Sequence, residues 1–218
     1  MKKIKFLERT SLLVSAFVAG VLLTGCATSK TEQTAVDASA NQIPNTDHIV
    51  RLSKDQRITQ PLPDKVLVNF HRVSWYSPTH RYAIFNGEGL FICDLPASAG
   101  FQYVCDPGQQ VFIGWAFGVS VVQADLAPGK VYDIMVDPGW GGMIAGAQIR
   151  LHPLTRNDRR RANLAEYEER EDLVSQIRTR HVVDFENRER AHVEDIKRDF
   201  LGGKKTRQVQ HLGTEDCR

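Results

Sequence analysis

The sequence has no large excess of charge of either sign. It contains 28 basic and 26 acidic residues among 218. Four basic residues and one acidic residue precede Cys26, so 24 basic and 25 acidic residues remain from Cys26 onward. A chain so close to neutrality lacks the excess of positive charge that is typical of nucleic-acid-binding proteins. We therefore expect no nucleic-acid partner.

The sequence also lacks the short motifs that mark common catalytic and metal sites. It has no Gly-x-Ser-x-Gly nucleophile elbow, and none of its seven histidines forms a His-x-x-x-His or His-Glu-x-x-His pair. The glycine-rich stretch DPGWGGMIAG at 137–146 has neither the lysine nor the strand-to-helix setting of a phosphate-binding loop. We therefore expect no catalytic residue, no metal site and no cofactor.

Two weaker indications of chemistry remain. His71 and His80 could meet across neighbouring strands, although such histidines are more often isolated on a surface or at a sheet edge. Cys105, which Asp106 follows, could be a nucleophile, but no histidine lies in the neighbouring sequence to activate it. The sequence therefore favours a protein that is not an enzyme.

The apolar run near the N-terminus is short. It covers thirteen residues, from Ser11 to Leu23, after the basic opening MKKIKFLERT. This run is too short to span a membrane comfortably, and the basic opening is typical of a secretory signal. The run ends in LTGC at 23–26, which resembles the lipobox of bacterial lipoproteins. The resemblance implies that residues 1–25 are a signal peptide and that Cys26 carries the lipid.

Lipidation of Cys26 would place the protein at a membrane surface. Two or three acyl chains make attachment effectively permanent. The residue after the cysteine is Ala27 and not an aspartate. By the sorting rule of enterobacterial lipoproteins, such a chain is sent to the outer membrane. Residues 26–62, rich in polar residues and without an apolar period, are expected to be the lipidated cysteine and a flexible linker. We therefore expect a periplasm-facing domain on a tether.

The segment from 63 to 153 has the pattern of a β-domain. Short runs rich in β-branched and aromatic residues are separated by turn dipeptides such as Asn86-Gly87 and Pro128-Gly129. The eight strand candidates are KVLVNFHRVSW, HRYAIFN, GLFICDL, GFQYVCD, QQVFIGWAF, GVSVVQADL, KVYDIMVD and IAGAQIRLH. The pattern predicts a mainly β fold, a small antiparallel β-sandwich of about seven or eight strands.

Individual residues of this segment can be assigned to faces. In KVYDIMVD, Tyr132, Ile134 and Val136 share one face, whereas Val131, Asp133 and Met135 share the other. The three tryptophans are more typical of a core or its rim than of a ligand platform; they are Trp75, Trp115 and Trp140.

The segment from 154 to 203 is highly charged. Of the 46 residues from Thr155 to Phe200, eleven are basic and twelve acidic, and a thin apolar stripe runs through them. This predicts a long charged C-terminal α-helix, or two helices, because Arg170 and Glu171 interrupt the stripe. A continuous helix over 164–201 would be about 57 Å long. We expect such a helix either to project into solvent or to meet a second copy or another partner, with Gly202-Gly203 as its stop and 204–218 as a tail.

The middle of the chain resembles a family of Gram-negative lipoproteins that share a domain of unknown function. The likeness rests on VLVNFHR at 66–72, the hairpin at 85–104, CDPGQQVF at 105–112 and LAPGKVYDIMV at 126–136, together with the tail HLGTEDCR. The resemblance implies a transthyretin-like or PEGA-like β-sandwich and a place in the cell envelope. It brings no catalytic residues.

Two functions follow as expectations. The first is a non-enzymatic binding or structural role in the cell envelope, with a protein or cell-wall partner or with a second copy through the helix. The alternative is an envelope hydrolase with a site beside the WGG loop at Trp140.

The cysteines at 93 and 105 could pair. An exported protein meets an oxidising compartment, and strands on either side of a turn near Ser98 would bring Cys93 opposite Cys105. We therefore predict a disulfide between them, which leaves Cys217 as the odd cysteine.

Overall fold

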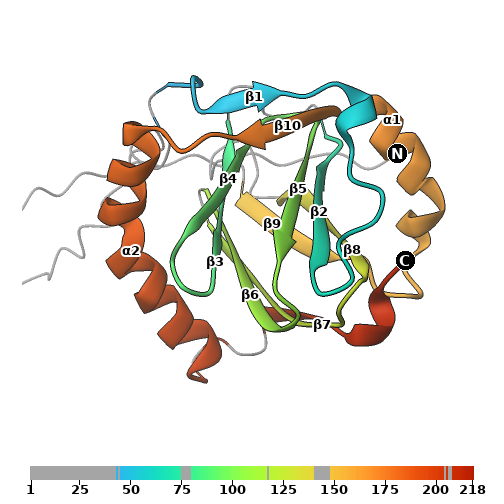
Figure 1. Ribbon diagram of the computed structural model, residues 1–218. Coiled ribbons are helices and arrows are strands. Elements are labelled where there is room, and N and C mark those ends of the chain that lie inside the picture. The colour runs from blue at the N-terminus through green and yellow to red at the C-terminus, as the bar shows by residue number, and fades with distance from the viewer. Residues whose placement is uncertain are drawn as a thin grey trace, which may run out of the picture. The chain divides into compact units, whose positions relative to one another are not determined.

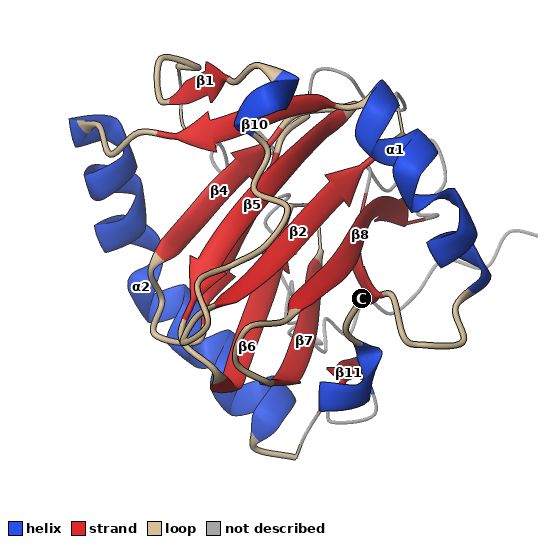
Figure 2. Ribbon diagram, turned by 45° about the vertical axis from the view of Figure 1, so that its right-hand side comes forward, coloured by secondary structure: helices blue, strands red, loops and turns tan. Residues whose placement is uncertain are grey.

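The computed structural model describes residues 43, 45–74, 80–116, 118–139, 148–203, 205 and 208–218, all in one compact unit. These residues form two β-sheets that face each other (Figures 1 and 2). Sheet A has the strand order β1 (Ile49–Arg51), β10 (Asp172–Gln176), β5 (Ala99–Cys105), β2 (Val66–Arg72), β8 (Val131–Gly139) and β9 (Gln148–Pro153). Sheet B has the order β11 (Val209–Leu212), β7 (Val119–Leu126), β6 (Gly108–Trp115), β3 (Tyr82–Asn86) and β4 (Phe91–Leu95). The mainly β sandwich that the sequence predicts is confirmed.

The main core lies between the two sheets. Alternation along each strand turns every second side chain inward, as with Tyr132 and Ile134 of β8, which have no exposed surface. Phe70 from sheet A meets Phe112 from sheet B edge to face, with ring centroids 5.5 Å apart. The alternate residue Asp133 lies on the opposite face of β8, as the sequence predicts, and in the structure this is the outer face of sheet A.

The eight strand candidates are confirmed as β2 to β9, but the predicted antiparallel pairing is wrong in part. Both sheets are mixed, because β2 pairs with β8, β10 with β5, and β11 with β7 in parallel. Parallel neighbours need a long crossover between them. Here the chain leaves sheet A after β2, builds strands of sheet B, and returns for β5 and β8.

The predicted long C-terminal helix is confirmed only in part. Residues 159–170 form the 3-10 helix η2 (Arg159–Asn163) and then α1 (Leu164–Arg170), whereas α2 (Arg180–Leu201) is a separate helix of 22 residues. Strand β10 lies between the helices, since the backbone becomes extended at Glu171. The interpretation of two helices with a break at Arg170 and Glu171 is therefore the correct one, and Gly202 ends α2 as predicted.

Helix α2 packs on the outer face of sheet B (Figure 1). Its buried apolar side chains meet those of sheet B, and Phe185 stacks on Phe85 with ring centroids 5.8 Å apart. The apolar side chains of α2 therefore pack against sheet B of the same chain. The sequence pattern predicted that the helix would either project into solvent or pack against a partner. The difference arises because a helix of 22 residues is about 33 Å long and fits the sheet, unlike one of about 57 Å.

Part of the expected linker is folded into the sandwich. Strand β1 and the 3-10 helix η1 (Lys54–Gln56) fall within 26–62, and Ile43 and His48 are buried. Residues 26–42 lie outside the described residues. In the part of the chain that the structure describes, no helix combines the length and the apolar character that crossing a membrane requires.

Candidate functional site

Three polar side chains lie together on the outer face of sheet A. Asn69 and His71 come from β2 and Asp133 from the neighbouring β8, and all three are buried. The alternation of VLVNFHR turns Val68 and Phe70 into the core and so turns Asn69 and His71 outward. The register of β2 and β8 pairs Asn69 with Asp133, and Nδ2 of Asn69 donates to Oδ1 of Asp133 at 2.9 Å.

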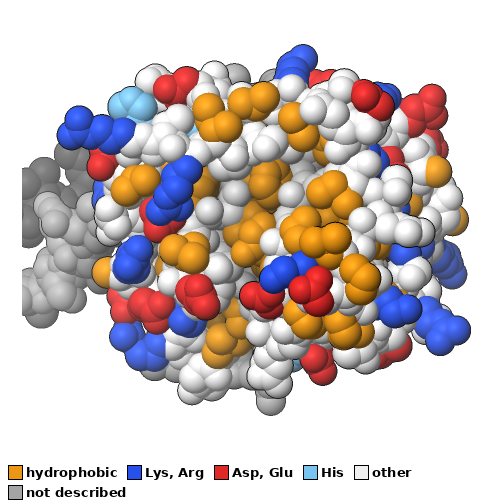
Figure 3. Space-filling model, viewed as in Figure 1, with side chains coloured by type: hydrophobic (Ala, Val, Ile, Leu, Met, Phe, Trp, Pro, Cys, Tyr) orange, Lys and Arg blue, Asp and Glu red, His pale blue; other side chains and the backbone are white. Residues whose placement is uncertain are grey.

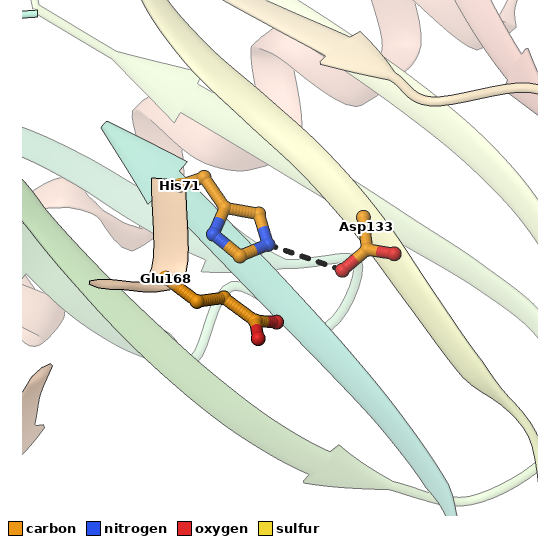
Figure 4. Close-up of side chains that lie close together, drawn as sticks. All are labelled: His71, Asp133 and Glu168. Carbon is orange, nitrogen blue, oxygen red and sulfur yellow. Dashed lines mark hydrogen bonds and ion pairs between the residues drawn. The ribbon is translucent and has the colours of Figure 1, made fainter. Parts of the chain in front are cut away.

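Both ring nitrogens of His71 face carboxylates. Nε2 lies 3.1 Å from Oδ1 of Asp133 (Figure 4), and Nδ1 lies 3.1 Å from Oε2 of Glu171. A ring between two acceptors is satisfied when both nitrogens carry protons. Burial alone lowers the pKa of His71, but the hydrogen bonds to Asp133 and Glu171 outweigh it and raise the pKa to about 9. His71 is therefore an imidazolium cation at neutral pH.

Glu171, between α1 and β10, reaches over Gly100 of β5. A methyl group at Gly100 would lie 2.2 Å from Oε1 of Glu171, closer than real Cβ atoms approach any atom. The missing side chain at position 100 thus makes room for this carboxylate. Arg57, directly after η1, donates from Nη2 to Oε1 of Glu171 at 2.9 Å. Glu171 is therefore held between Arg57 and His71.

Arg218 completes the site from the other side. Its Nε donates to Oδ2 of Asp133 at 2.7 Å, and its Nη2 lies 2.5 Å both from Oδ1 of Asp133 and from Oε1 of Glu168 in α1. Burial alone raises the pKa of Asp133, but the hydrogen bonds from Arg218 and His71 hold that pKa well below its usual range. Asp133 is therefore an ionised carboxylate that both cations share.

These contacts define a charged cluster with balanced charge. Its members, among the described residues, are Arg57, His71 and Arg218 as cations and Asp133, Glu168 and Glu171 as anions. The cluster joins four parts of the chain: sheet A, the residue after η1, helix α1 with the Glu171 that follows it, and Arg218, two residues after η4 (Thr214–Asp216). Breaking one partner of a buried ion pair is strongly destabilising. The arrangement therefore fastens the outer elements to the sheet.

Three residues of the cluster could serve as metal ligands. One ligand atom each of His71, Asp133 and Glu168 lies within 4.8 Å of the others (Figure 4). Imidazole nitrogen and carboxylate oxygen are common ligands of divalent cations. However, Nη2 of Arg218 is bonded to both carboxylates, and a doubly protonated His71 offers no lone pair. The guanidinium group thus takes the position of the cation, and these residues do not fit a metal while Arg218 is in place.

A second buried polar group lies at β4, the edge strand of sheet B. Oδ2 of Asp94 in β4 lies 2.7 Å from Nε of Arg81 and 3.3 Å from Nε2 of His48. The backbone nitrogen of Asp94 donates to Oε1 of Gln176 in β10 at 3.4 Å, which links sheet B to sheet A. A pocket of about 360 Å³ lies on the same edge of the sandwich, with Arg81 in its wall.

The predicted disulfide between Cys93 and Cys105 is wrong, because both are free thiols, as is Cys217. Cys93 lies in β4 of sheet B, whereas Cys105 lies in β5 of sheet A. The chain crosses from one sheet to the other over residues 96–98, so β4 and β5 are not hydrogen-bonded neighbours. The segment from 93 to 105 is a crossover between sheets, and both thiols are buried in the main core.

Other residues singled out from the sequence are in part outside the described residues. Cys26, Trp75 and Trp140 lie there, and so does the WGG loop of the alternative hydrolase. Trp115 is a core residue, as predicted, and its ring centroid lies 4.3 Å from that of His192 on α2. His80 is not a member of the charged cluster; its carbonyl accepts a hydrogen bond from Nη1 of Arg72 at 2.6 Å.

Sequence reasoning missed the charged cluster. Its residues are spread from 57 to 218, and no local spacing connects them. A signal was nevertheless present, since Asn69, His71 and Asp133 are polar residues within strands that are otherwise mostly apolar. A buried polar residue needs a partner, so these positions could have marked the outer face of sheet A.

Comparisons with known proteins leave the chain without an assigned family. The likeness to a lipoprotein family with a β-sandwich domain, seen in the sequence, stays a prediction. No model of a known protein family matches the chain, and no curated protein matches it.

Proposed function

We propose that this chain is a lipid-anchored protein of the cell envelope with a non-enzymatic binding or structural role. The location is supported by residues 1–26, where a basic opening, a short apolar run and LTGC follow one another. Ala27 and the likeness to Gram-negative lipoproteins support the outer membrane and a periplasm-facing domain.

The observation that carries the non-enzymatic role is the pairing within the charged cluster. An acid or base catalyst must reach its substrate with the proton in the right place. His71 and Asp133 have no exposed surface, and their polar atoms are bonded to Glu171, Arg218 and Asn69. These groups stabilise the fold, which favours a rigid scaffold over a reactive centre.

The outer face of sheet A supports the binding role. Val104 of β5 and Ile58, which bonds Gln102 of β5, are exposed there, and Leu62 of the same segment before β2 is 67% exposed. Gln102 of β5 holds the segment before β2 in place, since its Nε2 donates to the carbonyl of Ile58 and its Oε1 accepts from the backbone nitrogen of Ile58. In the view of Figure 3, hydrophobic side chains gather near the middle of the molecule, with charged ones among and around them. An apolar centre with a polar rim fits a protein partner.

The anchor is tested by lipid labelling in the cell. Cells that express the chain are grown with an alkyne-labelled fatty acid. The mass of the N-terminal peptide is then determined by mass spectrometry, and the fraction of the protein that is recovered with the membranes is measured. Acylation and membrane recovery are expected for the original chain and for Cys217→Ala, the matched cysteine control, and not for Cys26→Ala. Equal labelling of Cys26→Ala would contradict the proposed anchor.

The binding role is tested by photo-crosslinking in intact cells. A photo-reactive residue replaces Val104 on the proposed surface or, as control, Asp184 on the solvent-exposed side of α2, whose side chain is 66% exposed. A discrete crosslinked protein is expected from position 104 and not from 184. The same products from both positions would rule out a specific partner on this face.

A further inference from the structure

A pocket of about 360 Å³ opens between the two sheets on the side of β1 and β4. Sheet A continues through β10 to β1 on this side, whereas sheet B ends at β4. Strand β10 is still linked to β4 by the hydrogen bond from the backbone nitrogen of Asp94 to Gln176, whereas β1 lies beyond β10 at the edge of sheet A. Pockets of this size accept small ligands.

The floor of the pocket is apolar. It is formed by Ile49 of β1, Val174 of β10 and Ala99 of β5, together with Pro96 and Ala97 of the crossover between the sheets. The alanine side chains leave room for a short apolar group but offer no hydrogen bond. The floor thus selects for a small aliphatic part in the ligand.

The polar part of the lining consists of Thr46, Asp172 and two arginines, and the two arginines are held differently. Arg81 is fixed, because its side chain is only 12% exposed and it bonds Asp94 and the carbonyls of Ile43 and Asn45. Arg51 is 80% exposed and pairs with Asp172 at 3.3 Å, itself 56% exposed. Exposed pairs of this kind are weak. Arg51 can therefore exchange Asp172 for a ligand at little cost.

The crossover beside the pocket is strained. Ser98, between the two alanines of the floor, has φ 54°, a left-handed conformation that residues other than glycine rarely adopt. Its carbonyl accepts a hydrogen bond from the backbone nitrogen of Asp172 at 2.9 Å, which ties the crossover to β10. Backbone strain of this kind is concentrated at ligand clamps and other functional positions.

We propose that this pocket binds a small carboxylate that carries a short apolar group. The carboxylate meets the guanidinium groups of Arg51 and Arg81, and the apolar group lies on Ala97, Ala99 and Val174. Planar guanidinium groups are well suited to carboxylates. Such a ligand is either the C-terminal end of a peptide or a free amino acid, whose ammonium group would pair with the Asp172 carboxylate that Arg51 releases. The proposal deepens the binding role above and rests on it.

The test is an NMR titration of the chain from residue 26 onward, with Cys26→Ala so that no lipid is attached. The probes are alanine, N-acetylalanine, which imitates a peptide end, and alaninamide, which lacks the carboxylate. Saturable shifts of the amides of Arg51, Ala97 and Val174 are expected with alanine, N-acetylalanine or both, and not with alaninamide. N-acetylalanine alone would indicate a peptide end, and alanine alone a free amino acid.

Two matched charge reversals complete the test. Arg51→Glu should weaken binding about tenfold or more, because it removes a charge-assisted hydrogen bond. Arg180→Glu alters another exposed arginine that pairs with an exposed aspartate, Asp184, and should leave the affinity unchanged. No saturable shift with either carboxylate, an equal response to alaninamide, or an Arg51→Glu variant that binds normally would overturn the proposal. The titration uses protein without lipid. A negative titration would therefore contradict the pocket proposal but not the lipid anchor, and a failure to detect acylation would contradict the anchor but not the pocket.

Discussion

The carboxylate of Glu171 fills the space over Gly100 in which any other residue would place its Cβ atom. Glu171 also bonds His71 in β2 and Arg57 after η1. The glycine therefore decides whether Glu171 can join the charged cluster, although it contributes no charge itself.

Gly100→Ala should destabilise the protein. The added methyl group would lie 2.2 Å from Oε1 of Glu171, so the carboxylate must move away from His71. Overpacking of this kind costs about 1–3 kcal/mol in the free energy of unfolding, measured by urea denaturation. Gly118→Ala is the control, since its nearest neighbour, Cγ of Gln148, lies 3.5 Å from the added atom. Equal stability of both variants would contradict the described packing of Glu171.

The stability of the protein should fall as the pH rises through 9. The pKa of His71 is raised from 6.5 to about 9 in the folded protein, so the ring loses its proton more readily in the unfolded chain. By linkage its contribution, on the order of 3 kcal/mol, is fully present below about pH 6.5 and is lost as the pH rises through about 9. Denaturation of the original chain and of His71→Gln from pH 6 to 10 tests this. The dependence should weaken in His71→Gln and persist in His181→Gln, a control at an exposed position.

Arg218→Ala should lower the free energy of unfolding by about 3 kcal/mol or more. It leaves the buried carboxylate of Asp133 without the guanidinium that pairs with both of its oxygens. Arg218→Lys keeps the positive charge but cannot donate to both carboxylate oxygens in the planar geometry of a guanidinium group. It should therefore lower the free energy of unfolding less than Arg218→Ala does. Chemical denaturation at pH 7 measures all three proteins, and an unaffected Arg218→Ala would show that the pair contributes nothing.

The same variant should gain affinity for a divalent metal ion. Without Arg218, the ligand atoms of His71, Asp133 and Glu168 can close around Zn²⁺, which replaces the lost positive charge. Zn²⁺ should therefore raise the melting temperature of Arg218→Ala but not that of the original chain, more strongly at higher pH because the ion competes with the His71 proton. Addition of Glu168→Gln should abolish the effect. A rise that survives this second change would place the metal elsewhere.

Cys93 and Cys105 should be recovered as free thiols from protein purified without reductant. Cys93 is 1% exposed in its strand, and burial, with a smaller effect of Asp94, raises its thiol pKa well above the usual value. It should therefore resist alkylation in the folded protein and react after unfolding. Peptide mapping without reduction measures both cysteines, and a peptide pair joined through 93 and 105 would contradict the described strand arrangement.

Much of the β-sandwich could be predicted from local patterns, and the rest could not. The strands from β2 to β9 can be predicted because Gly and Pro separate runs that are rich in β-branched and aromatic residues. β1, β10 and β11 are only three to five residues long and lie in polar or charged segments, so no periodicity marks them. The sequence pattern of two strands joined by a short turn is the same whether the strands form a hairpin or belong to different sheets. For this reason the prediction of a disulfide between Cys93 and Cys105 is wrong.

The candidate sites depend on contacts between distant parts of the chain. The sequence could indicate that Asp133 faces away from the core, because the alternation of β8 is regular. It could not indicate that Arg218 and His71 meet this carboxylate, since that requires the parallel pairing of β2 and β8 and the return of the chain to sheet A.

The positions of β10 and β11 set the order in which the protein can fold. Each pairs in parallel with a strand from the middle of the chain, β5 in sheet A and β7 in sheet B. Neither sheet can be completed before this late part of the chain is present, and such distant pairings form slowly. Pulsed hydrogen exchange during refolding should find the amides of Val121 and Val209 protected at the same time. A fragment that ends before β10 would leave β5 and β7 without these neighbours, so the fold should not reach its full stability until nearly the whole chain is present.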